Sequence, residues 1–369
     1  MENELLGLMT LTRIPGIGDV LLKQLVAYSG SAVAVLNASG AALAKIPGIG
    51  SVLVNAIISN RNECRTAAEN ELNRLIQTGG RAIHYLQAEY PSRLRSIPDA
   101  PPVIFARGTF TFDNPKVLAI VGTRQATSYG KAAVESFLEQ LQEFRPVVVS
   151  GLAYGIDIHA HKTALQLGLE TWAVMGTSLN QIYPGPHKSI AAKIEEQGGL
   201  LTEVPLDAEP EPSRFPARNR IIAGLADAVF VVEAMEKGGA LITARLAADY
   251  FRDVFALPGN IGQATSAGCN ALITSNIASL ASSGSAIGLA MGWTPDSVAK
   301  KVSKSLEIPA DLSAEDANVI KLMLHGEIHL DEIAWKSGIP VNRIAGILLN
   351  LEFAGHVKSL PGKKFAIRD

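Results

Sequence analysis

The feature that most constrains the fold is a regular alternation of short apolar runs and helix-type segments between residues 116 and 283. Each run is followed by a glycine-containing turn and usually by a segment with helical periodicity. Continuous apolar runs indicate strands buried on both faces, and their alternation with helices predicts an α/β fold with a parallel sheet covered on both sides. The runs are KVLAIVG (116–122), PVVVSG (146–151), TWAVMG (171–176), GLLTEVP (199–205), DAVFVVEA (227–234) and DVFALPG (253–259).

The length of the chain and its changes in composition indicate several domains. A chain of 369 residues exceeds what one hydrophobic core usually holds. Before the alternating region, short helical patterns are broken by Gly and Pro, and the Pro-rich stretch YPSRLRSIPDAPPVIFARG (90–108) is typical of a connector. We therefore predict a helical domain over residues 1–80, the α/β domain over 81–290, a linker over 291–311 and a small domain over 312–369.

The charge and the cysteine content are those of an ordinary globular protein and do not indicate a particular ligand. Apolar residues make up 47% and charged residues 18% of the chain, with a formal net charge of −2, as in an ordinary soluble protein. A basic patch is still allowed, because opposite charges can lie on different faces. Cys64 and Cys269 lie far apart, which argues against a disulfide framework or a cysteine zinc site. There is no N-terminal signal, and the apolar run 286–293 is too short to span a bilayer, so we expect a cytoplasmic protein without membrane insertion.

One five-residue turn, IPGIG, occurs twice, at residues 14–18 and 46–50. Each copy ends one helical segment and opens another, which is typical of a tandem helix-hairpin-helix, and the free amides of the second helix can face a phosphate. The alternative is that the hairpins only pack on each other or on a partner, since few basic residues flank the turns, namely Arg13, Lys23 and Lys45. The candidate secondary DNA contacts are Gly16, Gly18, Gly48 and Gly50.

The turn after the first predicted strand is a candidate phosphate site. The segment VLAIVGTRQATSYGKAAVESFLEQL (117–141) reads as strand, Gly-rich turn and helix, and it places Gly122, Thr123 and Arg124 at the start of a helix. It lacks the complete G-x-G-x-x-G pattern, and the P-loop pattern is absent, so an ordinary dinucleotide or P-loop site is not expected. The arginine favours a phosphate or phosphodiester held by charge as well as by amides.

Three further segments follow predicted strands or precede the next one, so we expect them at the same edge of the sheet: SGLAYGIDIHAH (150–161), MGTSLNQIYPGPHKS (175–189) and SRFPARNRIIAGLA (213–226). The third places Phe215 among arginines, a combination that supplies a stacking surface and cations for single-stranded nucleic acid. The alternative is that Arg218 and Arg220 form structural ion pairs, for example with Asp157 or Glu233.

No catalytic or metal site is predicted. Asp157, His159 and His161 are better explained by structural roles, because Asp157 can cap a helix and histidines two residues apart do not share a helix face. The GTS sequence at 176–178 lacks the G-x-S-x-G elbow, and no nucleophile is paired with a base.

The ordered segments VGTRQATSYG, SGLAYGIDIHAH, GTSLNQIYP, GLLTEVP, FPARNRIIAGLADAVFVVEA, GALITARLAADYFRDVFALPGN and GCNALI together resemble the DNA-processing protein A family (DprA, also called Smf). The resemblance covers essentially the whole chain. It implies a helical N-terminal domain, an extended Rossmann-like core and a C-terminal winged helix. It also implies a protein without catalytic activity or cofactor that binds single-stranded DNA, helps load the RecA recombinase and supports natural transformation.

The resemblance also assigns binding residues by motif match. Gly176 and Ser178, in the turn after the third predicted strand of the α/β region, are added as candidate phosphate contacts. The family commonly has Ser where this chain has Gly238, so the resemblance supplies no hydroxyl contact there. The residues that match the family's DNA pocket are Gly122, Thr123, Arg124, Lys188, Phe215, Arg218, Asn219 and Arg220.

The family core forms a homodimer, which points to residues 269–281 here. Their apolar side chains either form the dimer contact or belong to the core. The candidates are Leu272, Ile273, Ile277 and Leu280.

Residues 312–369 read as a winged helix. A first helix is opened by Ser313, with Asp316 three residues on, and two further helices and the hairpin KSLPGKKFAI follow. The expected recognition helix carries only Asn342 and Arg343 near its start and is otherwise mostly apolar, which favours a protein-interaction module over reading of duplex DNA. Lys363 and Lys364 in the wing remain candidates for backbone contact.

Two rival functions stand beside a DNA-binding mediator. A Rossmann-like nucleotide hydrolase, similar to the cytokinin-activating phosphoribohydrolases, is distantly similar, but the chain has PGNIGQATSAG (258–268) in place of that family's Pro-Gly-Gly-x-Gly-Thr loop and catalytic glutamate. The other is a scaffold that only docks RecA-like partners through the winged helix.

Overall fold

The computed structural model describes residues 2–296, 312–323, 328–360 and 362–367. The chain forms two compact units, Met1–Trp293 and Thr294–Asp369, which we describe separately. Most of the predicted linker, residues 297–311, lies outside the described residues. No helix of the described part combines the length and apolar character needed to cross a membrane.

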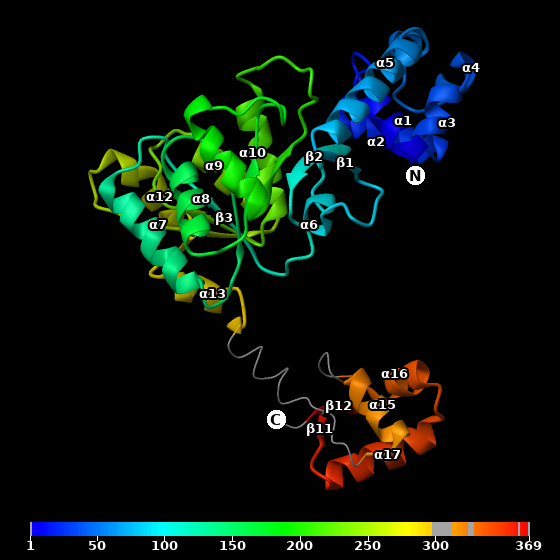
Figure 1. Cartoon of the computed structure of the whole chain (residues 1–369), viewed down its shortest axis with the longest axis vertical. Coiled ribbons are helices and arrows are strands. Elements are labelled where there is room, and N and C mark those ends of the chain that lie inside the picture. The colour runs from blue at the N-terminus through cyan, green and yellow to red at the C-terminus, as the bar shows by residue number, and fades with distance from the viewer. Residues whose placement is uncertain (1, 297–311, 324–327, 361, 368–369) are drawn as a thin grey trace. The chain divides into compact units, whose positions relative to one another are not determined.

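The first unit, shown in Figure 1 with β1, β2 and β3 labelled, is built on a nine-stranded sheet with the order β1-β2-β6-β5-β4-β3-β7-β8-β9. All neighbouring pairs from β6 to β9 are parallel, whereas β1–β2 and β2–β6 are antiparallel. Each of the six predicted strands is present, which confirms the α/β prediction. The strands are β1 (Arg81–His84), β2 (Val103–Gly108), β3 (Val117–Val121), β4 (Val147–Ser150), β5 (Thr171–Val174), β6 (Gly198–Thr202), β7 (Ala228–Val231), β8 (Asp253–Ala256) and β9 (Ser279–Leu280).

The interpretation of residues 90–108 as a connector is wrong for much of its length. The segment contains the short helix α6 (Ser92–Arg95) and strand β2, which pairs with β6 in the register Phe105↔Thr202. The four apolar residues Val103–Ala106 are all buried, so they follow the same rule as the other buried strands. The prolines before them obscured a strand that begins directly after the proline pair.

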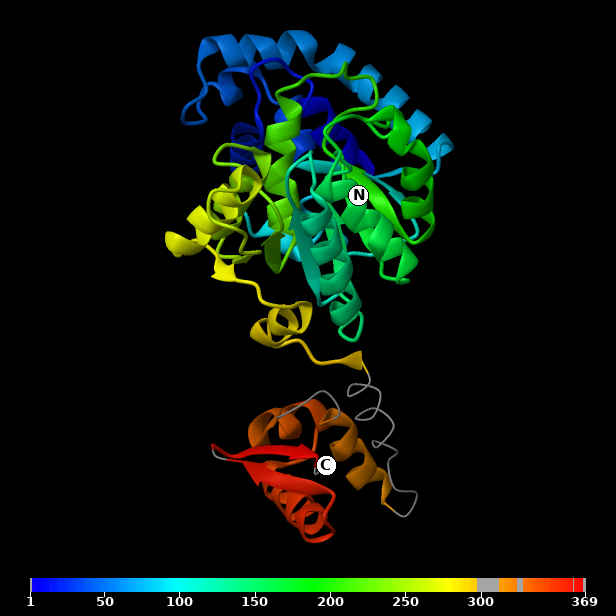
Figure 2. The same cartoon turned by 90° about the vertical axis from the view of Figure 1, so that its left-hand side faces the viewer.

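Helices cover both faces of the sheet (Figure 2). The packing of alternate residues of β3 shows which helices lie on which face. Leu118 and Ile120 pack in one apolar cluster with α7, α8 and α13, whereas Val117, Ala119 and Val121 pack in another with α10, α11 and α12. A third cluster joins α9 to the N-terminal helices. The covering helices are α7 (Ser128–Leu141), α8 (Ile156–Gln166), α9 (Lys188–Glu196), α10 (Arg214–Leu225), α11 (Gly239–Asp249), α12 (Ala264–Thr274) and α13 (Gly284–Ala290), with a 3₁₀ turn η1 at Gly185–His187.

Both IPGIG turns connect helices of the N-terminal region, and the tandem hairpin is present as predicted. Gly16 and Gly48 have φ of +85° and +80°, a backbone region that favours glycine. The second turn is tied to the helix that follows the first turn, because Gln24 Nε2 donates to Pro47 O at 2.8 Å. The helices are α1 (Glu2–Leu11), α2 (Asp19–Ser29), α3 (Ala32–Asn37), α4 (Gly40–Leu43) and α5 (Ser51–Gln77).

The second unit is a winged helix, as predicted. Its three-stranded sheet has the order β10-β12-β11, and the β11–β12 hairpin forms the wing (red in Figure 2). Ser313 caps the first helix, because its hydroxyl oxygen accepts from Asp316 N at 3.1 Å. The elements are α15 (Ala314–Leu322), β10 (Ile328–His329), α16 (Leu330–Ser337), α17 (Val341–Phe353), β11 (Val357–Leu360) and β12 (Lys364–Ile367).

Candidate nucleic-acid interface

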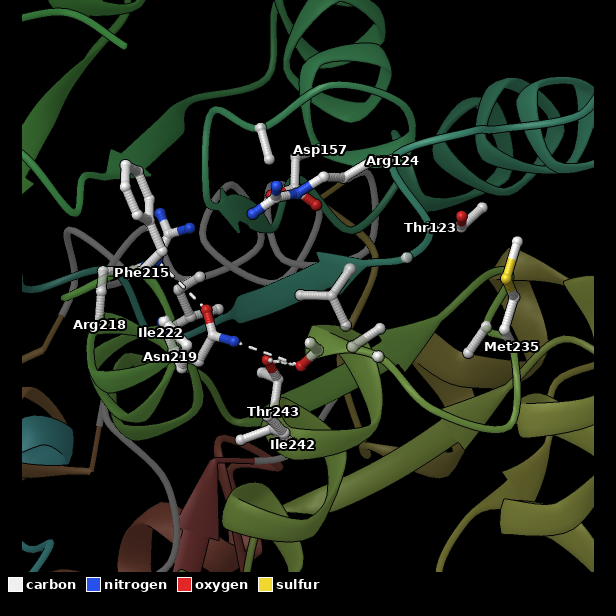
Figure 3. A pocket seen from close by; sticks show the side chains of 18 of the residues that line it. Thr123, Arg124, Asp157, Phe215, Arg218, Asn219, Ile222, Met235, Ile242 and Thr243 are labelled. Atoms are coloured by element: carbon white, nitrogen blue, oxygen red, sulfur yellow. Dashed lines mark hydrogen bonds between the residues drawn. The ribbon is translucent and has the colours of Figure 1, made fainter. Parts of the chain in front are cut away.

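A cavity of about 460 Å³ lies where the carboxyl ends of β3, β4 and β7 meet the start of α10. Figure 3 shows Thr123 and Arg124 on one side of it and Phe215, Arg218 and Asn219 on the other. The structure therefore brings together six residues that the sequence analysis selected from two separate segments. These are Gly122, Thr123, Arg124, Phe215, Arg218 and Asn219.

The turn that presents Arg124 is held by main-chain contacts. Thr123 N donates to Glu233 O at 2.8 Å, and Ile156 N donates to Thr123 O at 3.1 Å. Gly155, at φ +80°, permits this approach, since a Cβ there would lie 2.2 Å from Thr123 O. The Arg124 side chain is exposed, and within the described ranges its guanidinium forms neither an ion pair nor a hydrogen bond. A fixed turn thus carries an arginine that is available to a ligand.

The start of α7 is filled by a carboxylate of the protein itself. Glu233, at the end of β7, accepts from Thr127 N at 2.9 Å and from the Thr127 hydroxyl at 2.6 Å. A Cβ at Gly130 would lie 2.3 Å from Glu233 Oε2, so the glycine makes room for this group. A helix N-terminus favours an anion, and here Glu233 is that anion. Glu233 therefore occupies part of the helix start at which the sequence predicts a phosphate, and phosphate binding by the exposed residues of this turn stays a prediction.

Arg218 is built into the wall of the cavity. Its Nη1 donates to Gly151 O at 2.6 Å and to Val174 O, which ties α10 to the ends of β4 and β5. The side chain is only 5% exposed, and burial lowers the pKa of Arg218 to about 10. Asp157 is buried beside it, and burial raises the pKa of that carboxyl although Arg218 opposes the shift. Arg218 consequently acts on a ligand in the cavity mainly through its positive charge and less as a free hydrogen-bond donor.

Asn219 and Phe215 complete this side of the cavity. Asn219 Nδ2 donates to Gly239 O at 3.3 Å, which ties α10 to the start of α11. Phe215 packs closely over Gly176, where a Cβ would lie 2.8 Å from Phe215 Cδ1. Gly176 therefore makes room for an aromatic wall and does not line the cavity itself.

Arg220 faces away from the cavity and lies in a network of carboxylates. Its Nη2 donates to Glu203 Oε2 at 2.6 Å and to Asp19 Oδ2 at 2.8 Å, and Asp99 Oδ2 lies 3.8 Å from its Nε. The alternative of a structural ion pair therefore describes Arg220, with partners other than those first considered. Because Asp19 opens α2, the network joins α10 to the N-terminal helices.

Two further predicted contacts lie outside the cavity. Ser178 is 2% exposed, so its hydroxyl is withdrawn from solvent. Lys188 is exposed at the start of α9, on the loop that follows β5. Of these two side chains, only Lys188 is placed to meet a ligand.

The hairpin glycines differ in their surroundings. Gly18 precedes Asp19, whose carboxylate binds Arg220, and Arg13 beside this turn forms an ion pair with Glu71. Gly50 precedes α5, which has no acidic residue in its first turn. The first hairpin is thus engaged with the core, and DNA contact by the second stays a prediction.

The candidate dimer residues separate into core and surface. Leu272 is buried in the core, and Ile273 and Ile277 are partly buried against the same cluster. Leu280 is 53% exposed on β9, the edge strand of the sheet. The alternative of a core role therefore describes Leu272.

The residues considered for a metal site are separated by their contacts. His159 Nε2 lies 2.8 Å from Glu135 Oε1, whereas His161 Nδ1 lies 2.7 Å from the Thr171 hydroxyl. Burial lowers the pKa of His161 to about 3. In the part of the chain that the structure describes, no three His, Cys, Asp or Glu residues are grouped to hold a metal ion.

The winged helix offers few free cations on its recognition helix. Arg343, at the start of α17, binds Glu315 through Nη2 at 2.9 Å. Val341, Leu349 and Phe353 on the same helix are exposed. This surface is more apolar than one that reads duplex DNA.

Sequence reasoning missed the contribution of the loop between β7 and α11. Lys237 is exposed on the rim, and Gly239 and Thr243 line the cavity. The segment EKGGALITA follows a predicted strand, so the rule that located the other loops applied to it as well. No sequence pattern indicated the role of Glu233, because its contact with Thr127 depends on the spacing of β7 and α7.

With the cavity placed at the β3 edge, comparison with known proteins decides the family. The model of the DNA recombination-mediator protein A family matches residues 81–291. The chain belongs to this family. A second match, to the DprA winged helix domain, covers residues 304–363.

Members of the DNA recombination-mediator protein A family resemble the chain in sequence and in structure. Protein Smf of Escherichia coli is 37% identical over 283 residues, which cover 76% of this chain and 75% of that protein. The X-ray structure of DNA processing protein A from Streptococcus pneumoniae matches with a TM-score of 0.68 and 33% identity, over 76% of this chain and 95% of that one. DNA processing protein A from Helicobacter pylori, described for its unique single-stranded DNA binding mode, matches with a TM-score of 0.53 and 29% identity, over 58% and 97% of the two chains.

Proposed function

We propose that this protein is a recombination mediator that binds single-stranded DNA through residues 81–290. The observation that carries the proposal is the cavity at the β3 edge, which is lined by Arg124, without a partner among the described residues, by the exposed Lys237 and by the aromatic wall of Phe215. Cations suit the phosphodiester backbone and an aromatic surface suits unpaired bases. The ligand therefore needs both a charged backbone and accessible bases.

Family membership supports the finer parts of this proposal. The Helicobacter pylori relative is described by its binding of single-stranded DNA. We propose that this chain protects incoming single strands in the cytoplasm and helps load RecA on them during natural transformation. We also propose a homodimer, for which the exposed Leu280 on edge strand β9 is the most accessible candidate contact.

Binding without catalysis is favoured over nucleotide hydrolysis by the position of the acidic groups. Glu233 holds the start of α7, where a nucleotide phosphate would lie in a Rossmann-type site. Asp157 is buried beside Arg218. Neither carboxylate is free to act on a glycosidic bond at the rim.

The proposal is tested by fluorescence anisotropy with a labelled oligo-dT at low and at high salt. We expect tight binding at low salt that weakens steeply as salt rises, because counterions are released from the DNA. The variant Arg124→Ala/Lys188→Ala removes two exposed cations, whereas Arg65→Ala on α5 removes an exposed arginine from a distant surface. Wild-type affinity in the double variant would refute the proposed site.

A further inference from the structure

The loops that follow β4 and β5 each carry an exposed aromatic side chain that does not line the cavity. Tyr183, in the loop after β5, is 56% exposed, and Tyr154, in the loop after β4, is 46% exposed. We propose that Tyr183 and Tyr154 form a stacking surface for the bases of single-stranded DNA, extending the cavity along the edge of the sheet. This inference rests on the proposed function and adds the path of the strand beyond the cavity.

Tyr183 is joined to the cavity through a ring contact. Its ring centroid lies 5.4 Å from that of Phe215, at an interplanar angle of 53°. Phe215 lines the cavity and is held over Gly176. Tyr183 therefore packs against a fixed ring while more than half of its surface faces solvent, so a base that leaves the cavity meets a second aromatic surface.

Tyr154 is held in the same way by His187. The two ring centroids lie 4.8 Å apart at 70°, and His187 is itself buried, with Nδ1 2.8 Å from Leu152 O. Ala153, next to Tyr154 in sequence, lines the cavity. The second tyrosine thus borders the cavity through a different loop.

A cation lies close in sequence to both ring pairs. Lys188 directly follows His187 and is exposed at the start of α9. The loop 179–188 therefore carries Tyr183, His187 and Lys188 within six residues. A strand whose bases stack on these rings also needs a cation near its phosphates. Lys188 is the candidate for that contact outside the cavity, because Arg124 lies in a different loop.

The packing of these rings distinguishes them from ordinary surface tyrosines. A ring that is already held against another ring loses little conformational freedom when a base stacks on it. Stacking is also tolerant of sequence, since every base has a π-face. We therefore expect a preference for DNA that has bases over DNA that lacks them, with little preference among bases.

The experiment compares oligo-dT with an abasic oligonucleotide of the same length and phosphate number, using the full chain. We expect the wild type to bind oligo-dT about tenfold more tightly than the abasic strand. In Tyr183→Leu/Tyr154→Leu this ratio falls but stays above one, because Phe215 still offers a ring to the bases, while the dependence of affinity on salt is unchanged because no cation is lost. Tyr183→Phe/Tyr154→Phe keeps the rings and is expected to keep the ratio.

The control Tyr28→Leu removes an exposed tyrosine from α2 and is expected to keep the wild-type ratio. Equal binding of both strands by the wild type would overturn the stacking surface and the base-stacking role of Phe215, and would leave only the binding of single strands through their phosphates. A wild-type ratio in the double Leu variant would also overturn the stacking surface, by placing base contact elsewhere. Absence of binding to either strand would overturn the proposed function itself. Loss of the ratio in the Phe variant would overturn the stacking surface too, because the rings are kept, and this test holds even where the Leu variant folds poorly.

Discussion

The rim of the cavity and the junction with the N-terminal helices both depend on arginines, but they use them in opposite ways. Arg124 is exposed and unpaired within the described residues, whereas Arg220 is held by Glu203 and Asp19. Arg218, two residues before Arg220 on α10, is buried toward the cavity. Arg218 thus belongs to the cavity and Arg220 to the junction, although both lie on α10. The reason is that two residues along a helix turn the side chain by more than half a revolution.

The contrast teaches that the number of arginines in a segment does not measure its capacity to bind DNA. Carboxylates distant in sequence neutralise Arg220, and carbonyls at strand ends satisfy part of Arg218. Arg124 keeps its charge available because the contacts that hold its turn are made by its neighbours, and within the described residues none of them uses the Arg124 guanidinium.

The sharpest way to break this comparison is to remove Arg220. We expect Arg220→Ala to lower the free energy of unfolding of the first unit by about 2 kcal/mol, because three carboxylates then lose the arginine that they share. The loss is smaller than for a fully buried network, since Asp99 and Asp19 are partly exposed. Urea unfolding followed by circular dichroism measures it. A stability equal to that of the wild type would contradict a structural role for the network.

The second prediction concerns how the free energy of unfolding depends on acidic pH through the buried His161. Burial lowers the pKa of His161 to about 3, below that of the unfolded chain, so the unfolded state binds the proton first. The stability due to neutral His161 is complete above about pH 6.5 and is lost as pH falls toward 3, by about 2 kcal/mol between pH 6.5 and 5. Urea unfolding at several pH values measures the slope. His161→Gln removes the titration, so an unchanged slope in this variant would contradict the assignment.

The third prediction concerns Arg124, whose removal we expect to change DNA binding more than stability. We expect Arg124→Ala to weaken binding of oligo-dT about tenfold and to reduce the salt slope by about 1, since one phosphate contact is lost. Its free energy of unfolding should stay within about 0.5 kcal/mol of the wild type, because the side chain is exposed. Anisotropy titrations and urea unfolding of the same sample check both halves. A variant that loses stability but not affinity would exchange the roles of Arg124 and Arg220.

The smallest effect is expected from Glu203→Gln at the junction. Burial raises the pKa of Glu203 although Arg220 opposes the shift, so the folded state holds the proton more tightly than the unfolded state. The stability linked to this proton is complete below about pH 4.5 and is lost as pH rises through the folded pKa. Relative to wild type, Glu203→Gln should therefore gain stability from pH 4 to pH 7, by less than about 1 kcal/mol. A relative loss over this range would show that the ion pair outweighs burial.

Much of the fold followed from local pattern. The six strand segments were each continuous apolar runs, and the repeated IPGIG marked both hairpins. Strand β2 was missed because Pro101 and Pro102 precede it and because it joins the sheet antiparallel, outside the alternating region. The cavity was predictable from the rule that loops after parallel strands share one edge, which placed Arg124 near Phe215.

By itself, the sequence determined the α/β architecture, the tandem hairpins, the winged helix and the set of loops from which the cavity is built, because these depend on hydrophobic period and turn residues over short distances. Only the tertiary structure decided which cations are free. The partners of Arg220 and the groups that meet Glu233 lie up to 201 residues away in sequence, and the pairing of such distant charges depends on how the sheet and helices pack.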